Sequence, residues 1–276
     1  MKFSPQRFIW VLAGGGVVLS GFLGTLISWQ PEAEVSFLNV GRGDATFITT
    51  EHGHRILYDC GDTGSSTVEA LYDQLHPLAR RIDVMIVSHS DRDHYGGCFE
   101  VLEHFEVDKV MINGTRKEED SLYEEFLHTA AQDAELIPGF RGTEIDLGSR
   151  SIQVLHPSSQ NWGEQRDKDN ENSIVLHLQS DKQNIGLLGD ALASTEQEII
   201  QEFPDMEWNV FQVAHHGSNT STSQDLLEGV QPEIGIISVS RNNQYGHPHQ
   251  DVTDRLKENQ IEIFRTYEQK SLDFTW

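Results

Sequence analysis

Short apolar runs alternate with amphipathic stretches along most of the chain, and these two periods predict strands that alternate with helices. Strands are predicted over residues 34–41, 45–50, 54–62, 82–90, 107–113, 151–157, 173–179, 184–190, 208–218, 233–240, 261–267 and 271–276. Helices are predicted over residues 65–75, 94–105, 118–134, 194–203 and 251–259. This alternation, with its many strands, indicates a layered α/β domain.

The first 30 residues break this pattern. Phe8 to Trp29 is a run of 22 residues without a charge, and Lys2 and Arg7 precede it. As a helix the run would extend about 33 Å, which is enough to cross the hydrocarbon core of a bilayer. We favour an uncleaved membrane anchor over a cleaved signal, because the end of the run is a poor cleavage site, and a buried N-terminal helix is a third interpretation. The flanking basic residues favour an exported domain outside the cytoplasm.

Residues 31–276 contain no repeat and no linker, so we expect one domain after a segment formed by residues 1–30. Residues 158–172 are polar and lack periodicity. A loop of this length is typical of a lid or a binding element, and a disordered surface loop is the alternative.

The net charge limits the class of partner. The chain has 20 basic and 44 acidic side chains, a formal charge of −24. Loose, sequence-independent binding to nucleic acid needs a basic surface and is therefore disfavoured. A nucleic-acid enzyme whose metal ions supply local positive charge stays open. The acidic excess also fits a protein that is simply kept soluble by its surface.

The chain has two cysteines, Cys60 and Cys98. Each lies beside a segment that carries potential metal ligands, and outside the cytoplasm a disulfide between them is an open alternative. Two cysteines do not define a disulfide framework. We therefore expect both to be buried, unpaired side chains.

The densest polar cluster follows the strand predicted at residues 82–90. His89, Asp91, Asp93 and His94 lie within six residues, and two glycines follow. The burial and mutual repulsion of these groups must be offset by positive charge, and Arg92 is the only basic residue among them. Divalent metal ions are the simplest source of that charge.

Further polar groups follow other predicted strands, and the carboxyl ends of strands in α/β folds often meet at one edge. The groups are Asp59 to Asp62, Asp190, the pair His215 and His216, and the YGHPH segment at residues 245–249. Together they exceed what one four-coordinate ion needs, whereas two divalent ions that share a carboxylate would use them all. Asp59 and Asp62 are interpreted as supporting groups or loop caps, with direct ligation as the alternative.

These segments together resemble the metallo-β-lactamase fold. The motif S-H-x-D-x-D-H-x-G-G at residues 88–97 is followed by L-G-D at 188–190 and H-H-G-S at 215–218. Within that fold, the chain is most similar to the hydrolase domain of ComEC-type DNA-uptake proteins. The similarity includes FLNVGRGDATFI at 37–48, LYDCG at 57–61, the segment from Asn170 to Ser173, and YGHP at 245–248. The resemblance implies a four-layer αββα sandwich with a two-metal site at one edge.

The resemblance also implies a role for each ligand. His89 and Asp91 would hold the first ion, Asp93 and His94 the second, and Asp190 would bridge both. His216 would complete the second site, and His215 would face the substrate. Asp91 stands where the commoner motif of the fold has a histidine, which makes the site suitable for manganese as well as zinc.

Two departures from the family pattern weaken the expected site. The additional histidine that the fold usually supplies to the first ion has no clear counterpart, and His156 is the candidate for it. Asn39 stands where the family often has an aspartate, so a supporting contact to a ligand could be lost.

The function that the resemblance implies is a metal-dependent phosphodiesterase or nuclease that uses a hydroxide bridging two metal ions. His247 is expected to contact a phosphoryl oxygen or to protonate the leaving group, with His249 as a weaker second. Asn170, Ser173 and Ser218 are expected at the substrate. The substrate would be a phosphodiester or another ester, including short single-stranded nucleic acid, and no obligate protein partner is evident. Lactam, lactone or thioester hydrolysis is the alternative activity, and an inert metal-binding module is the third hypothesis.

Overall fold

The structure is a computed structural model that describes residues 32–76, 79–115, 120–160, 162 and 169–276. The predicted membrane anchor at residues 1–30 lies outside the described residues, as does much of the predicted loop at 158–172. No helix in the described part of the chain has both the length and the apolar character needed to span a bilayer.

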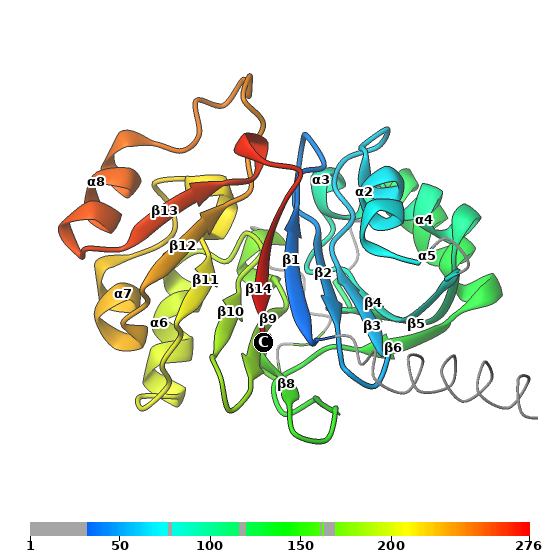
Figure 1. The fold of residues 1–276 in the computed structure, drawn as a ribbon, viewed down its shortest axis with the longest axis horizontal. Helices are drawn as coiled ribbons and strands as arrows, with labels where there is room; N and C mark the ends of the chain where they lie inside the picture. Colours follow the sequence, from blue (N-terminus) through cyan, green and yellow to red (C-terminus); the bar gives the residue numbers. More distant parts are fainter. Residues whose placement is uncertain (1–31, 77–78, 116–119, 161, 163–168) are drawn as a thin grey trace, which may run out of the picture.

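The first of two mixed sheets joins the N-terminal strands to the last strand of the chain (Figure 1). Its order is β14-β1-β2-β3-β4-β5-β6, and β3 to β6 run parallel to one another. The antiparallel pairing of β14 with β1 returns the C-terminus to the start of the domain. The strands are β1 (Glu34–Leu38), β2 (Thr46–Thr49), β3 (Arg55–Tyr58), β4 (Arg81–Ile86), β5 (Glu106–Ile112), β6 (Glu135–Pro138) and β14 (Ser271–Thr275).

The second sheet has the order β13-β12-β11-β10-β9-β8-β7. Strands β10 to β13 run parallel, whereas β7, β8 and β9 form an antiparallel meander that pairs with β10. The strands are β7 (Glu144–Asp146), β8 (Ser151–His156), β9 (Val175–Gln179), β10 (Ile185–Leu187), β11 (Val210–Gln212), β12 (Ile234–Ile237) and β13 (Glu262–Arg265).

Helices cover the outer face of each sheet (Figure 1). On the first sheet lie α2 (Thr67–Gln74), α3 (Arg92–Tyr95), α4 (Cys98–His104) and α5 (Ser121–Asp133). On the second lie α6 (Ala193–Glu202), α7 (Gln224–Val230) and α8 (Gln250–Glu258). Short 3₁₀ turns are η1 (Asp169–Asn172), η2 (Ala214–Gly217) and η3 (Thr266–Glu268).

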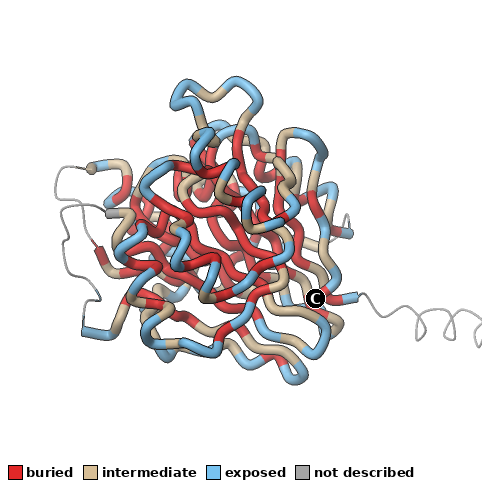
Figure 2. The backbone as a smooth tube through the Cα atoms, turned by 90° about the vertical axis from the view of Figure 1, so that its left-hand side faces the viewer, coloured by how far each residue is buried: buried red, intermediate tan, exposed pale blue. Residues whose placement is uncertain are grey.

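Three hydrophobic clusters separate these layers. One lies between the first sheet and its helices, one between the two sheets, and one between the second sheet and its helices. Figure 2 shows the buried positions running through the interior of the molecule, with exposed positions concentrated in the connecting loops. The order helix, sheet, sheet, helix agrees with the αββα sandwich that the resemblance to the metallo-β-lactamase fold implied.

Some predicted elements differ from the structure. The helix predicted at residues 94–105 is split into α3 and α4 at Gly96 and Gly97, because the chain there passes against the loop after β3. A Cβ atom at Gly97 would lie 2.1 Å from the carbonyl oxygen of Cys60. The sequence patterns did not predict the short edge strands β6 and β7 or the helix α7.

Cys60 and Cys98 form a disulfide, so the expectation of two unpaired cysteines is wrong. The glycine-enabled approach of α4 to the loop after β3 sets their Cα atoms 5.2 Å apart, which suits a disulfide. The same contact includes a hydrogen bond of 2.8 Å from the Cys60 amide to the carbonyl of His94. The disulfide therefore joins the two segments that carry Asp59 and His94.

Candidate metal centre

The polar segments predicted from the sequence meet where loops from the two sheets face each other. His89 and His94 follow β4, Asp190 follows β10, and the pair His215 and His216 follows β11. These strands belong to the parallel parts of their sheets, so their carboxyl ends lie at the same edge.

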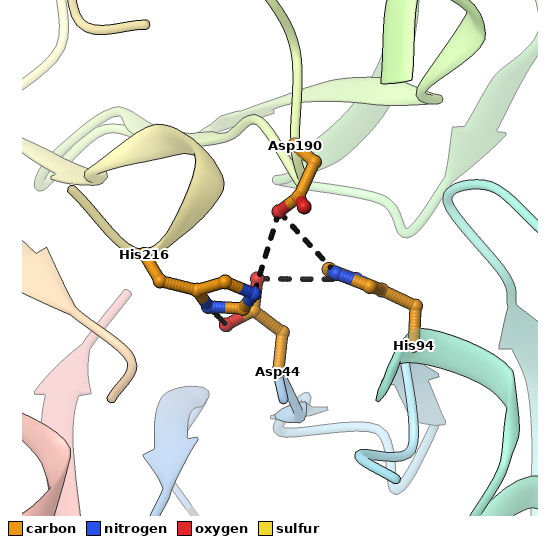
Figure 3. Close-up of side chains that lie close together, drawn as sticks. All are labelled: Asp44, His94, Asp190 and His216. Atoms are coloured by element: carbon orange, nitrogen blue, oxygen red, sulfur yellow. Dashed lines mark ion pairs between the residues drawn. The ribbon is translucent and has the colours of Figure 1, made fainter. Parts of the chain in front are cut away.

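The residues predicted for the second ion, called the second group from here on, surround the Oδ1 atom of Asp190. The Nε2 atom of His94 lies 3.3 Å from Oδ1, and the Nε2 atom of His216 lies 3.7 Å from it. The Oδ2 atom of Asp93 lies 3.6 Å from the same His216 nitrogen. Figure 3 shows Asp190, His94 and His216 converging with Asp44 from separate segments of the chain. Asp93, His94, Asp190 and His216 are the set predicted for the second ion, and Asp44 is the addition.

The residues predicted for the first ion, called the first group from here on, surround the other oxygen of Asp190. The Nε2 atom of His89 lies 3.9 Å from Oδ2 of Asp190 and 3.5 Å from Oδ2 of Asp91. The Nε2 atom of His215 lies 3.5 Å from Oδ2 of Asp190. Asp190 thus presents one oxygen to each group, which is the geometry expected of a bridging carboxylate.

His215 therefore lies with the residues predicted for the first ion. This is the ion for which the sequence analysis found no clear additional histidine ligand. His156 does not join either group: its Nδ1 atom bonds the Ser173 carbonyl, and its Nε2 atom lies 3.7 Å from Glu198. The sequence interpretation placed His215 at the substrate instead.

The backbone of η2 explains how adjacent histidines reach different sides of Asp190. His215 and His216 have φ values of 53° and 54°, in the left-handed region that non-glycine residues seldom adopt. Their rings are 6.2 Å apart and inclined by 71°. Strain of this kind persists where surrounding contacts hold it, and it is common at functional sites.

Hydrogen bonds fix the tautomers of His94 and His216. The Nδ1 atom of His94 lies 2.8 Å from Oδ2 of Asp59, and Nδ1 of His216 lies 3.0 Å from the Ser238 carbonyl. Both partners can only accept, so Nδ1 carries the proton in each neutral ring. The Nε2 atom that faces Asp190 then has its lone pair available for a metal ion.

The histidines of the first group are held in a similar way. Nδ1 of His89 lies 2.9 Å from the Ser88 hydroxyl, whose own proton is donated to Asp59. Ser88 therefore accepts from His89, and Nε2 of His89 is again the free nitrogen. Nδ1 of His215 lies 3.2 Å from the Thr220 hydroxyl. All four rings therefore turn their Nε2 atom toward Asp190.

The donor atoms fit divalent ions. Nε2 of His89, Nε2 of His94, Nε2 of His216 and Oδ1 of Asp190 are buried and make no hydrogen bond within the described part of the chain. Buried polar atoms without partners are costly, and metal coordination is the usual way to satisfy a convergent set of them. Imidazole and carboxylate donors in this ratio suit zinc and manganese alike.

The pKa values of Asp190 and His94 also indicate a site that favours cations. Burial by itself would raise the pKa of Asp190, but the charges of His94 and His216 outweigh it and hold that pKa well below its usual range. Burial would lower the pKa of His94, but Asp190 and Asp59 raise it well above its usual range. The carboxylates of this site thus favour positive charge among them, which is the condition for binding cations.

Asp44 is a site residue that the sequence interpretation missed. It is 1% exposed, and its Oδ1 atom lies 3.3 Å from Nδ1 of His216. Its Oδ2 atom accepts a hydrogen bond of 2.5 Å from Gln212. Asp44 faces Nδ1 of His216, and although burial lowers the pKa of that ring, the charge of Asp44 helps to raise this pKa well above its usual range. Its Oδ1 atom makes no hydrogen bond within the described residues and lies in one group with His94, His216 and Asp190, so metal binding by Asp44 is the alternative role. An acid directly before a strand and after Gly43 was the available sequence indication.

The predicted supporting acids lie behind the ligands. Asp59 is fully buried and bonds both His94 and Ser88, in agreement with the supporting role. Asp62 pairs with Arg42 at 3.2 Å and with Arg92 at 2.9 Å. Asn39 donates its side chain to the carbonyl of Gln269.

The residues predicted to contact the substrate differ in how close they lie to Asp190 and in how far they are buried. Asn170 donates to Oδ2 of Asp190 at 3.3 Å, so it touches the first group directly. Ser173 and Ser218 are buried, at 0% and 5% exposure, and shape the chain around the site.

His247 is half-buried beside the paired histidines. Its ring centroid lies 5.8 Å from that of His215 and 6.4 Å from that of His216. Burial and the neighbouring imidazoles lower the pKa of His247 to about 4. His249 lies behind it, where its Nδ1 atom accepts from the Asn219 amide.

Comparison with known proteins agrees with this geometry. The family model of the metallo-beta-lactamase superfamily matches residues 38–241. ComE operon protein 3 of Bacillus subtilis is 29% identical over 263 residues, which cover 89% of this chain and 33% of that protein. Recombination protein 2 of Haemophilus influenzae is 34% identical over 230 residues, which cover 82% of this chain and 27% of that protein. The chain thus spans about a third of the length of these curated relatives.

A solved structure shares the fold at low sequence identity. The metallo-beta-lactamase fold protein YhfI of Bacillus subtilis superposes with a TM-score of 0.55 and 11% identity, covering 87% of this chain and 99% of YhfI. The family match covers most of the chain, and the residues of its motifs converge on Asp190. The chain therefore belongs to the metallo-beta-lactamase superfamily of hydrolases, and the two relatives named above are ComEC-type competence proteins.

Proposed function

We propose that this protein is a metal-dependent phosphodiesterase with single-stranded nucleic acid in its substrate range. The observation that carries the proposal is the arrangement around Asp190, whose two oxygens face two separate sets of ligand types. A pair of ions at such a carboxylate suits in-line displacement at phosphorus, because one ion acts on each side of the reacting centre.

His89, Asp91 and His215 would hold one ion, and Asp93, His94 and His216 would hold the other, with Asp190 between them. When bound, the ions supply a water molecule acidified to near-neutral pKa and positive charge at the phosphoryl oxygens. Asp59 and the Ser238 carbonyl keep the rings of His94 and His216 in the tautomer that this requires. Zinc and manganese are both compatible with the donor set.

His247 is proposed as a hydrogen-bond donor to a phosphoryl oxygen. Its lowered pKa makes it neutral at pH 7, so one of its ring nitrogens donates without carrying a charge into the site. Its backbone is fixed by Asn243, which accepts from the His247 amide at 2.9 Å. Protonation of the leaving group by His247 is the weaker form of this proposal, because a group with so low a pKa holds little proton at pH 7.

The location proposed for the domain is outside the cytoplasm. The disulfide between Cys60 and Cys98 is typical of oxidising compartments, and the apolar segment at residues 8–29 would supply a membrane anchor. Similarity to ComEC-type proteins supports a nucleic-acid substrate, although the matched region is only about a third of each relative.

The test is hydrolysis of bis(p-nitrophenyl) phosphate by the full-length protein in mild detergent, with manganese or zinc added. We expect metal-dependent turnover that Asp190→Asn abolishes and that His104→Gln, a change at an exposed histidine, leaves intact. A labelled single-stranded oligonucleotide then tests the nucleic-acid part. Absence of turnover with either metal in folded protein contradicts the proposal.

The alternative is hydrolysis of a lactam, lactone or thioester on the same fold. Asp91, which stands in place of a histidine, makes a true lactamase the weaker candidate. Turnover of nitrocefin or of an acyl thioester in the same samples, without phosphodiester turnover, would favour it.

A further inference from the structure

A pocket of about 190 Å³ opens beside the second ligand group and is not explained by metal binding. Asp93 and His216 form its inner end, and no residue of the first group lines it. Its outer walls come from the loop before β2, through Arg42, and from the loop after β12, through Tyr245 and His247. A group attached to a phosphate at the ions would therefore extend into this pocket on the Asp93 side.

Tyr245 is the most exposed large apolar side chain among the described residues, at 57%. Arg42 donates to its hydroxyl at 2.9 Å, which holds the ring at the mouth of the pocket. The Arg42 guanidinium also lies 5.6 Å from the centroid of the ring, and the 57% exposure of Tyr245 is the part that stays available to a ligand. An exposed aromatic ring fixed by a hydrogen bond loses little entropy when it binds.

The ring of Tyr245 continues a row of nearly parallel rings that leads from the ligands to solvent. Tyr245 and His247 are 5.9 Å apart and inclined by 29°. His247 and His216 are 6.4 Å apart and inclined by 26°. The three rings thus follow one another along the pocket, and the exposed part of Tyr245 at its mouth is the surface on which a flat heteroaromatic group can stack.

The charge of the protein favours recognition of a ligand by base stacking over electrostatic binding along a phosphate backbone. With a formal charge of −24, the protein lacks the basic surface that carries most nucleic-acid affinity. Near the pocket, Arg42 and Arg92 share one carboxylate, Asp62, so the immediate rim is less negative than the rest of the chain. The amides of Asn242 and Gln244 also line the pocket and can donate to or accept from any base edge.

We propose that this pocket binds the nucleobase next to the scissile phosphate, with Tyr245 as its stacking platform and Arg42 as the residue that positions Tyr245. The proposal rests on the phosphodiesterase function proposed above and narrows its substrate class to nucleotides. It assigns the nucleoside to the Asp93 side of the site and makes Tyr245 a determinant of specificity.

The test is equilibrium binding of two small ligands to the full-length protein by calorimetry. Thymidine 5′-monophosphate and 2-deoxyribose 5-phosphate share the sugar and phosphate and differ in the base. We expect the nucleotide to bind about 5- to 150-fold tighter, the range that one base–aromatic stack supplies. Tyr245→Leu removes this ratio, and Tyr245→Phe, which keeps the ring but loses the hydrogen bond from Arg42, retains only part of it. Tyr72→Leu, at another exposed tyrosine, is the matched control and retains it in full.

Equal affinity of the two ligands for the native protein overturns the proposal, as does a ratio that survives Tyr245→Leu. If the protein hydrolyses bis(p-nitrophenyl) phosphate but binds both ligands equally, nucleobase binding by the pocket is rejected and the phosphodiesterase activity is retained. If binding shows a base preference that depends on Tyr245 but the protein hydrolyses no phosphodiester, nucleobase binding by the pocket is supported and the phosphodiesterase activity is rejected.

Discussion

His215 and His216 are neighbours in the chain, yet their Nε2 atoms face opposite oxygens of Asp190. The distances are 3.5 Å from His215 to Oδ2 and 3.7 Å from His216 to Oδ1. Two successive residues in the left-handed region produce this divergence. One dipeptide thus serves both halves of the site, and its strain is held by hydrogen bonds from Nδ1 to Thr220 and to Ser238.

This relationship predicts separate effects on metal content. His215→Ala should weaken the ion at the His89 side, and His216→Ala should weaken the ion at the Asp93 side. After dialysis, each variant should retain about one ion per chain, compared with two for the native protein. Elemental analysis of the dialysed protein measures this, with His104→Ala as the surface control. Retention of two ions by His215→Ala would remove that residue from the ligand set.

The loop that carries Asp44 packs against Asp93, and Gly43 is the point of contact. Its φ is +89°, and a Cβ atom there would lie 1.8 Å from the backbone oxygen of Asp93. Gly43→Ala should therefore lower the free energy of unfolding by about 2–4 kcal/mol, from backbone strain together with overpacking. Gly41→Ala is the matched control, because its φ is +83° and no atom lies within 4 Å of its Cβ position. It should cost only about 1 kcal/mol. Urea denaturation compares the two, and equal costs would contradict this account of Gly43.

The disulfide should contribute substantially to stability. It closes a loop with a sequence separation of 38, for which chain entropy gives about 3–4 kcal/mol. We expect the double variant Cys60→Ala, Cys98→Ala to melt at a lower temperature than the oxidised native protein. Dithiothreitol should lower the melting temperature of the native protein and leave that of the variant unchanged. Two free thiols in denatured, unreduced native protein would show that the disulfide does not form.

His177 should make the stability of the fold depend on pH. Burial lowers its pKa to about 4, and its Nδ1 atom accepts a hydrogen bond of 2.9 Å from Trp208. The unfolded chain takes up a proton near pH 6.5 that the folded protein resists until about pH 4. Stability should therefore fall as the pH decreases through this window, by up to about 3 kcal/mol for this group.

His177→Gln isolates that effect, because its amide oxygen can still accept from Trp208 and does not titrate. The difference in unfolding free energy between native protein and variant should shrink as the pH is lowered from 7 to 4. A difference that stays constant over this range would show that His177 titrates normally.

Local sequence patterns predicted most of the fold and much of the site. His89 to His94 was identifiable because four ligand types share one loop, and Asp190 because it ends a short apolar strand. The parallel strands were predictable from continuous apolar runs such as residues 82–90. Their carboxyl ends bring the clusters together by the general rule for α/β sheets.

Features that depend on contacts between distant segments were not predictable. The role of Asp44 depends on its position beside Nδ1 of His216, and the role of His215 depends on the position of its Nε2 atom beside Asp190. Both positions follow from packing and not from the spacing of residues along the chain. The pairing of Cys60 with Cys98 depends on the approach of two backbones at Gly97. Strands β6 and β7 were missed because they are short and partly exposed, so they lack a clear period of two.

The central claim is that Asp190 bridges two divalent ions, and electron paramagnetic resonance of the manganese-loaded full-length protein tests it most directly. A shared carboxylate holds two ions close enough for their spins to couple. We predict the spectrum of a coupled manganese pair for the native protein and that of isolated ions for Asp190→Ala. A spectrum of isolated ions in native protein that holds two manganese ions per chain would contradict the bridging role of Asp190.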